Sequence, residues 1–124
     1  MPLSGCRILV VEDEALIALD LEHTLRELHA VVIGPVDNIA DARRFIAAGR
    51  IDCAVLDVQL GADSIKVLIP ELDARDIPRV FMTAFSQTDL PTTWKAWPVI
   101  LKPMATGDLL RAIEQVVVSR AREP

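Results

Sequence analysis

Five side chains in this sequence have the types and positions that phosphoryl chemistry needs. Three are carboxylates, one is a hydroxyl and one is an ammonium group: Glu12, Asp13, Asp57, Thr83 and Lys102. Carboxylates held close together raise one another's pKa values unless a cation joins them, and an oxygen-rich site of this kind suits Mg²⁺. An aspartate beside such an ion can attack phosphorus to form an aspartyl phosphate. A lysine and a hydroxyl would stabilise the charge that develops on the phosphoryl oxygens.

Each of these residues also has an ordinary structural explanation when it is taken alone. Glu12 and Asp13 could favour the amino terminus of a helix, and Lys102 could be a surface charge. Asp57 is the hardest to explain in this way, because it directly follows the apolar run AVL and an ionised carboxylate is costly to bury without a partner. The case for a site therefore depends on whether the fold brings the five residues together.

Short apolar runs alternate with segments of helical periodicity along the whole chain. The predicted strands are residues 7–11, 31–36, 53–56, 79–82 and 99–101. Four helices are predicted. The first covers residues 15–28, with Leu16, Ile17, Leu21, Leu25 and Leu28 on its apolar face, and the second is capped by Asn38, carries Ala42, Phe45 and Ile46, and is closed by Gly49. The third covers residues 65–75, and the last is capped by Thr106. Pro70 should kink the third helix or delay its start. For residues 84–98, the sequence predicts at most one short helix.

Strands that alternate with helices, each strand a continuous apolar run, predict a parallel sheet covered on both faces. The fold class is therefore α/β, a doubly wound, three-layer domain with a five-stranded sheet in the order 2-1-3-4-5. Ligands of such sheets bind at the carboxyl ends of the strands. Glu12, Asp13, Asp57, Thr83 and Lys102 all follow strands that are neighbours in this order, so they should converge on one edge.

Composition limits the function classes further. The chain has 124 residues, of which 52% are hydrophobic, so residues 1–124 are expected to form one domain. Its net charge is −5 and its basic residues are scattered, which disfavours nucleic-acid binding. No apolar run approaches the roughly 20 residues that span a bilayer, and acids interrupt the start where a secretory signal would continue. Cys6 and Cys53 are interpreted as reduced thiols, and the expected location is the cytoplasm.

Four segments, RILVVEDE, AVLDVQL, VFMTA and ILKP, resemble in order the signatures of two-component receiver domains, which have a flavodoxin-like fold. The resemblance implies that Asp57 is the phosphoacceptor and that Asp13 binds Mg²⁺ (or Mn²⁺) directly. Glu12 would act on the metal through water, and the backbone carbonyl of Gln59 would be a further ligand.

The same resemblance assigns the remaining site residues. Thr83 and Lys102 would contact the phosphoryl oxygens, Ala84 would leave room for the phosphate, and the Lys102–Pro103 peptide would be cis. Val99 departs from the family, which often carries an aromatic residue there that swings inward on activation. The segments FMTAF, DVQLG and PVILKP resemble the FATGUY subgroup of single-domain receivers, which typically lacks that aromatic residue, although Ala84 stands where its motif has Gly.

The leading function is therefore a receiver that takes a phosphoryl group from a histidine kinase or a histidine phosphotransfer protein. Few residues follow the last predicted helix, so output is expected through contacts with an unidentified downstream protein or through competition for the phosphoryl groups of a kinase. The domain is not expected to be an enzyme beyond its own phosphorylation and dephosphorylation. One alternative is a pseudo-receiver that binds partners without phosphorylation. Another is a metal-dependent phosphohydrolase with a D-x-D arrangement, but Gln59 stands where its general acid would be.

Overall fold

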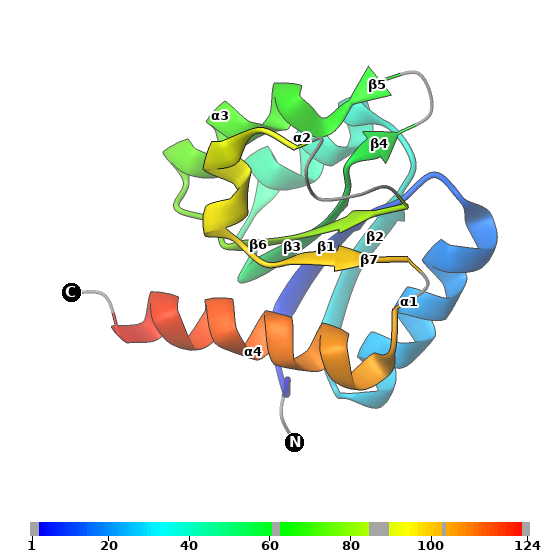
Figure 1. The fold of residues 1–124 in the computed structure, drawn as a ribbon. Coiled ribbons are helices and arrows are strands. Elements are labelled where there is room, and N and C mark those ends of the chain that lie inside the picture. Colours follow the sequence, from blue (N-terminus) through cyan, green and yellow to red (C-terminus); the bar gives the residue numbers. More distant parts are fainter. Residues whose placement is uncertain (1–2, 61–62, 85–89, 103, 123–124) are drawn as a thin grey trace.

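The computed structural model describes residues 3–60, 63–84, 90–102 and 104–122 of the chain. Five of its strands form one parallel sheet (Figure 1). They are β1 (Arg7–Val11), β2 (Val31–Val36), β3 (Cys53–Asp57), β6 (Arg79–Thr83) and β7 (Val99–Leu101). Their order in the sheet is β2-β1-β3-β6-β7, which confirms the predicted order 2-1-3-4-5.

Helices cover both faces of this sheet, as the alternation of strands and helices predicts (Figure 1). One face is covered by α1 (Ala15–Glu27) and α4 (Thr106–Arg122), and the other by α2 (Ile39–Ala48), η1 (Ile65–Leu68), α3 (Ile69–Ala74) and η3 (Thr92–Ala96), where η denotes a 3-10 helix. We call the two apolar layers the α1/α4 core and the α2/α3 core. No described helix is both long and apolar enough to cross a membrane.

The central strand β3 shows why the sheet must be covered twice, because all five of its residues are buried. Val55 packs into the α1/α4 core, whereas its neighbours Ala54 and Leu56 pack into the α2/α3 core. Adjacent side chains of a strand point to opposite faces, so a strand covered on both sides reads as a continuous apolar run. Asp57 is the last residue of this strand and its one charged residue.

The helix boundaries confirm two sequence signals and correct a third. Asn38 caps α2 by accepting a hydrogen bond from the Asp41 amide at 2.8 Å. Pro70 delays the third helix, because a 3-10 turn comes first and α3 carries Pro70 in its first turn. Thr106 was predicted to cap the last helix, but it lies inside α4. The carbonyl of Ala105 instead accepts hydrogen bonds from the amides of residues 108 and 109, so the helix starts one residue earlier than predicted.

Two predicted apolar faces extend beyond the core. Leu16 of α1 and Phe45 of α2 have the helical spacing of core residues, but they are 82% and 38% exposed. Leu21 and Leu25 carry the buried face of α1 instead. The segment between β6 and β7 holds only η3 among its described residues, which is consistent with the prediction of at most one short helix.

Two features of the fold had no counterpart in the predictions. The first is a hairpin of two short antiparallel strands, β4 (Gln59–Leu60) and β5 (Asp63–Ser64), directly after β3. The second is a bulge in β2, where the pairing with β1 shifts by one residue between Leu9 and Val11. Gly34 lies at this bulge with a φ of +92°, and a Cβ atom there would be 2.8 Å from the Val36 nitrogen, so the position requires glycine.

Candidate functional site

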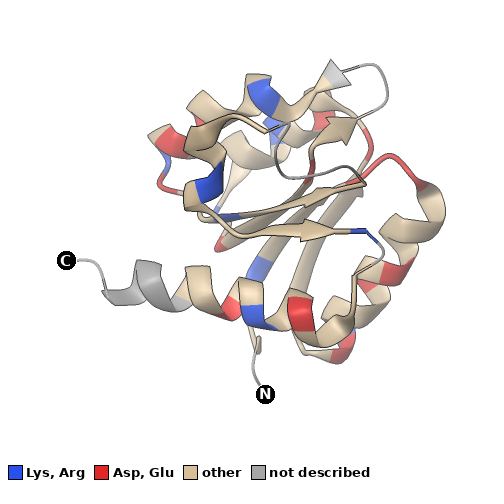
Figure 2. Cartoon of the chain, viewed as in Figure 1, with Lys and Arg blue, Asp and Glu red and all other residues tan. Residues whose placement is uncertain are grey.

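Glu12, Asp13 and Asp57 meet at the carboxyl end of the sheet. One carboxylate oxygen from each lies within 4.8 Å of the others. The register explains this, because Val11 of β1 pairs with Leu56 of β3 and the acidic residues follow at once. Figure 2 shows the acidic stretch after β1 and the basic end of β7 at the same edge of the sheet. The predicted convergence of the three carboxylates is therefore present in the structure.

Lys102 links two of these carboxylates. Its Nζ atom lies 2.6 Å from Oε1 of Glu12 and 2.9 Å from Oδ2 of Asp57. The backbone amide of Lys102 donates to the carbonyl of Thr83 at 2.9 Å, so the pairing of β7 with β6 positions the lysine. The cation therefore lies between Glu12 and Asp57 and partly neutralises their charge.

Backbone amides fix the other oxygen of each buried carboxylate. The Glu14 amide donates to Oε2 of Glu12 at 3.0 Å, and the Gln59 amide donates to Oδ1 of Asp57 at 3.2 Å. The amide of Glu12 in turn donates to the carbonyl of Val36 at 2.9 Å. Both carboxylates are thereby held in fixed orientations. Phosphoryl transfer depends mainly on such positioning and on electrostatic stabilisation.

Burial gives the site its electrostatic character. Glu12 is 1% and Asp57 5% exposed, whereas Asp13 is exposed to solvent. Burial, with the neighbouring Asp57 carboxylate, raises the pKa of Glu12 above its ordinary value. Burial alone would lower the pKa of Lys102, but its contacts with Glu12 and Asp57 outweigh that effect and raise it. Lys102 is therefore charged at neutral pH.

The three carboxylates fit a hard divalent cation. They supply oxygen donors only, they lie close enough to share one ion, and the exposed Asp13 leaves the site open to water. Mg²⁺ prefers such a site, because it takes one or two carboxylates and keeps several waters. The remaining negative charge, which Lys102 alone does not balance, favours the same ion.

The other predicted residues lie around this centre. Thr83 is buried at the end of β6, and Gln59 starts β4 two residues after Asp57. Ala84 and Lys102 line a pocket of about 290 Å³ beside α1. Pro103, and with it the predicted cis peptide, lies outside the described residues. The pairing of Lys102 with Glu12 was not predicted, although both residues follow strands whose ends meet at one edge.

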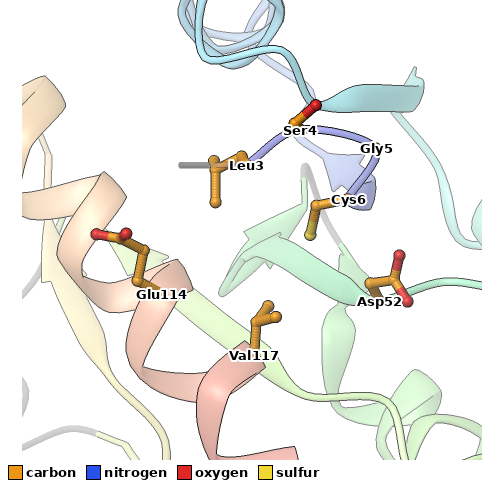
Figure 3. Close-up of a pocket in the computed structure, with 7 residues that line it drawn as sticks. All are labelled: Leu3, Ser4, Gly5, Cys6, Asp52, Glu114 and Val117. Carbon is orange, nitrogen blue, oxygen red and sulfur yellow. The ribbon is translucent and has the colours of Figure 1, made fainter. Parts of the chain in front are cut away.

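A second cavity, of about 350 Å³, lies at the opposite end of the sheet (Figure 3). Leu3 and Cys6 of the amino-terminal segment, Asp52, and Glu114 and Val117 of α4 contribute to its walls, and the Cys6 sulfur points into it. Burial raises the pKa of the Cys6 thiol to about 11, so the thiol is neutral and a poor nucleophile at neutral pH. Its chemistry is thus unlike that of the acidic edge.

Comparison with protein families shows to which family this domain belongs. The model of the response regulator receiver domain matches residues 8–114, which include all five site residues. The chain belongs to this family. Receivers are generally non-enzymatic signalling modules that interact with histidine kinases or phosphotransfer proteins, and they bind Mg²⁺ at an acidic site. The sequence signatures therefore identified the family correctly.

Individual relatives agree with this assignment. The transcriptional regulatory protein PdtaR of Mycobacterium tuberculosis is 36% identical over 94% of this receiver, which spans 58% of the length of that relative. The solution structure of SdrG from Sphingomonas melonis Fr1 is 36% identical, with a TM-score of 0.80 over 95% of this chain and 98% of that one.

Two further structures are described with beryllium fluoride. The BeF3-activated conformation of SdrG, from Pseudomonas melonis Fr1, is 38% identical with a TM-score of 0.78, and covers 92% of this receiver and 98% of that chain. TrrA from Thermotoga maritima, in complex with Mg²⁺ and BeF, is 25% identical with a TM-score of 0.77, and covers 90% of this receiver and 98% of that chain.

Proposed function

We propose that this receiver accepts a phosphoryl group on Asp57 from a phosphohistidine of a histidine kinase or histidine phosphotransfer protein. The observation that supports this most directly is the position of Asp57. It is a buried carboxylate that ends a central strand, contacts Lys102 at 2.9 Å and lies with Glu12 and Asp13 in a cluster that fits Mg²⁺. A buried charge in such surroundings costs stability, and a reaction at that carboxylate accounts for its presence.

The step is a direct displacement at phosphorus. An oxygen of Asp57 forms the new P–O bond while the P–N bond to the donor imidazole breaks, and the imidazole leaves with the electron pair and takes a proton. Lys102 holds one Asp57 oxygen and the Gln59 amide holds the other, so the carboxylate is already oriented before the donor arrives. Lys102 then passes from the carboxylate to the incoming phosphoryl oxygens, with Thr83 as a second donor.

The metal ion would be held by Asp13 and Asp57, by Glu12 through water, and by the backbone carbonyl of Gln59. Mg²⁺, or Mn²⁺ in its place, supplies positive charge that offsets the charge of the phosphoryl oxygens and of the carboxylates. Glu12 also keeps Lys102 at the site through the 2.6 Å contact. A pseudo-receiver has no need of such a cluster, and a phosphohydrolase of the D-x-D type would need an acid where this chain has Gln59.

The proposal also covers the location of this reaction and its output. We place it in the cytoplasm, which the two free cysteines favour, and we treat residues 1–124 as one receiver domain. We also propose output by contact with a downstream protein, because receivers are generally signalling modules without an enzymatic activity of their own.

The test is mass spectrometry of the protein after incubation with acetyl phosphate and Mg²⁺. We expect a single phosphoryl adduct that is stable in acid and labile in base, and that does not form when EDTA removes the metal. Peptide mapping should place it on Asp57. Failure to form any adduct, with either acetyl phosphate or a phosphorylated histidine kinase, would contradict the proposal and favour the pseudo-receiver.

A further inference from the structure

Trp94, the buried residue of η3, stacks on β6. The rings of Trp94 and Phe81 are nearly parallel, at 10°, with their centroids 4.9 Å apart. Trp94 is 7% and Phe81 0% exposed, so the stack is closed to water. Among the described residues of the connection between β6 and β7, it is one of two aromatic contacts that hold this segment against the sheet.

The stack lies on the face of the sheet to which the alternation of β6 also assigns Thr83. Phe81 and Thr83 are two residues apart on β6, so both point to the α2/α3 side. Val99 of β7 pairs with Phe81 and packs in the same core as Trp94. Trp94 and Val99 thus both belong to the α2/α3 core. Val99 stands where many receivers have the switch aromatic residue.

A second contact anchors the end of the same segment. The guanidinium carbon of Arg79 lies 4.9 Å from the ring centroid of Trp97, the residue that follows η3. Arg79 is 2% exposed and is fixed by a 2.7 Å ion pair with Asp73 and by hydrogen bonds to the carbonyl of Ile77. Trp97 is therefore attached to the start of β6, far from the site, whereas Trp94 is attached two residues before Thr83.

We propose that Trp94 takes the part of the absent aromatic switch, and that its stack on Phe81 transmits the state of Asp57 to the exposed surface of η3. This inference rests on the proposed phosphorylation of Asp57. When Thr83 is drawn toward a phosphoryl oxygen, the end of β6 moves, and Trp94 moves with Phe81. The exposed residues Thr92 and Lys95 then change position, while Trp97 stays fixed on Arg79.

The two tryptophans are the only ones in the chain, so single substitutions separate them. Trp97→Phe leaves Trp94 as the only tryptophan, and Trp94→Phe leaves Trp97. Each variant is titrated with beryllofluoride and Mg²⁺ while tryptophan emission and bound fluoride, by ¹⁹F NMR, are followed together. We expect the emission of Trp97→Phe to shift as fluoride binds and that of Trp94→Phe to stay constant.

The outcomes are distinct. Bound fluoride with unchanged Trp94 emission, or with a shift carried by Trp97 alone, would overturn the inference and leave the proposed function intact. Absence of bound fluoride in the unmodified protein would overturn the proposed function and this inference with it. Phe at position 94 keeps an aromatic ring on Phe81, so the variant should fold.

Hydrogen exchange tests the role of the stack itself. Trp94→Leu removes the ring, and Lys95→Ala is a matched control on the exposed side of the same 3-10 turn. We expect both variants to form the Asp57 adduct. The beryllofluoride-induced change in protection over η3 should be lost in Trp94→Leu and retained in Lys95→Ala. Retention of that change in Trp94→Leu would show that the signal bypasses the stack.

Discussion

The two ends of the sheet differ in how their acidic side chains are paired. At the amino end, Asp52 accepts a 2.8 Å hydrogen bond from the Arg7 amide and lies 3.5 Å from Arg50, whose carbonyl accepts from the Arg7 guanidinium. At the carboxyl end, Glu12 and Asp57 share the ammonium group of Lys102, and Asp13 lies beside them. Asp52 thus has an amide and a cation of its own, whereas Glu12 and Asp57 share one cation.

This difference separates charge that serves the fold from charge that serves a reaction. A carboxylate with its own cation and amide needs no other explanation, so Asp52 is a structural residue. Like charges gathered in a buried site raise one another's pKa values and lower stability. Selection for folding alone would remove such a cluster, and its presence at the carboxyl end is what points to function.

The largest expected effect comes from exchanging one aspartate at each end. Asp57→Asn should abolish the phosphoryl adduct, because the amide keeps the shape of the side chain but loses the charge of a nucleophile and metal ligand. Asp52→Asn is the matched control and should leave adduct formation unchanged. Mass spectrometry after incubation with acetyl phosphate and Mg²⁺ measures both. An undiminished adduct in Asp57→Asn would place the phosphoacceptor elsewhere.

Measurements of Mg²⁺ affinity should separate the metal ligands of the acidic edge from Lys102. Asp13→Ala should weaken Mg²⁺ binding by at least about tenfold, because it removes a direct ligand and even the loss of a group that only supports a ligand weakens metal binding by about that much. Lys102→Ala should retain the metal, because it removes a positive charge and no ligand. Thermal unfolding across a Mg²⁺ titration reports both affinities, since a ligand of the folded state raises stability. The reverse ranking of the two variants would show that their roles are wrongly assigned.

A smaller effect should follow from Arg79, a buried cation of β6 that pairs with Asp73 and with the carbonyl of Ile77. Arg79→Met should lower the free energy of unfolding by about 1–3 kcal/mol, because it leaves the carbonyl of Ile77 without this donor. Asp73→Asn, at the exposed partner, should cost less than about 1 kcal/mol. Urea unfolding measures both. Equal losses would mean that the ion pair, and not the buried donor, carries the stability.

The smallest effect concerns Cys6 at the amino end. Its folded pKa of about 11 exceeds the ordinary value of 9.0, so its contribution to stability is complete below pH 9 and is lost as pH rises toward 11. Alkylation by iodoacetamide at pH 8 should therefore be slower in the folded than in the urea-unfolded protein. Cys6→Ser removes the thiol and should flatten stability between pH 9 and 11. Fast alkylation of the folded protein at Cys6 would contradict the raised pKa.

The sheet and the acidic edge were predictable because the chain encodes them locally. Each strand is a continuous apolar run, and the residue that ends a parallel strand must lie at the carboxyl edge. Asp57 and Glu12 could therefore be placed together from the order of the strands and the residues that follow them. Their roles in catalysis and metal binding stay predictions until the experiments above are done.

Other features depend on distant contacts that leave no periodic signal. The strands β4 and β5 have two residues each, too few to show alternation. The stack of Trp94 on Phe81 joins a 3-10 turn to a strand, and nothing in either segment specifies the other. Leu16 has the spacing of a core residue but is exposed, because periodicity defines a helical face and not how far the sheet extends beneath it.

The bulge at Gly34 has a consequence for how this chain tolerates insertions and deletions. Side chains of a strand alternate between faces, yet Ile33 and Val36, three residues apart, both pack in the α2/α3 core. The extra residue in β2 makes this possible and also places the Val36 carbonyl 2.9 Å from the Glu12 amide. A homologue that gained one further residue between Ile33 and Val36 would turn Val36 to the opposite face. Its acidic edge would lose an anchor although every acidic residue was still encoded.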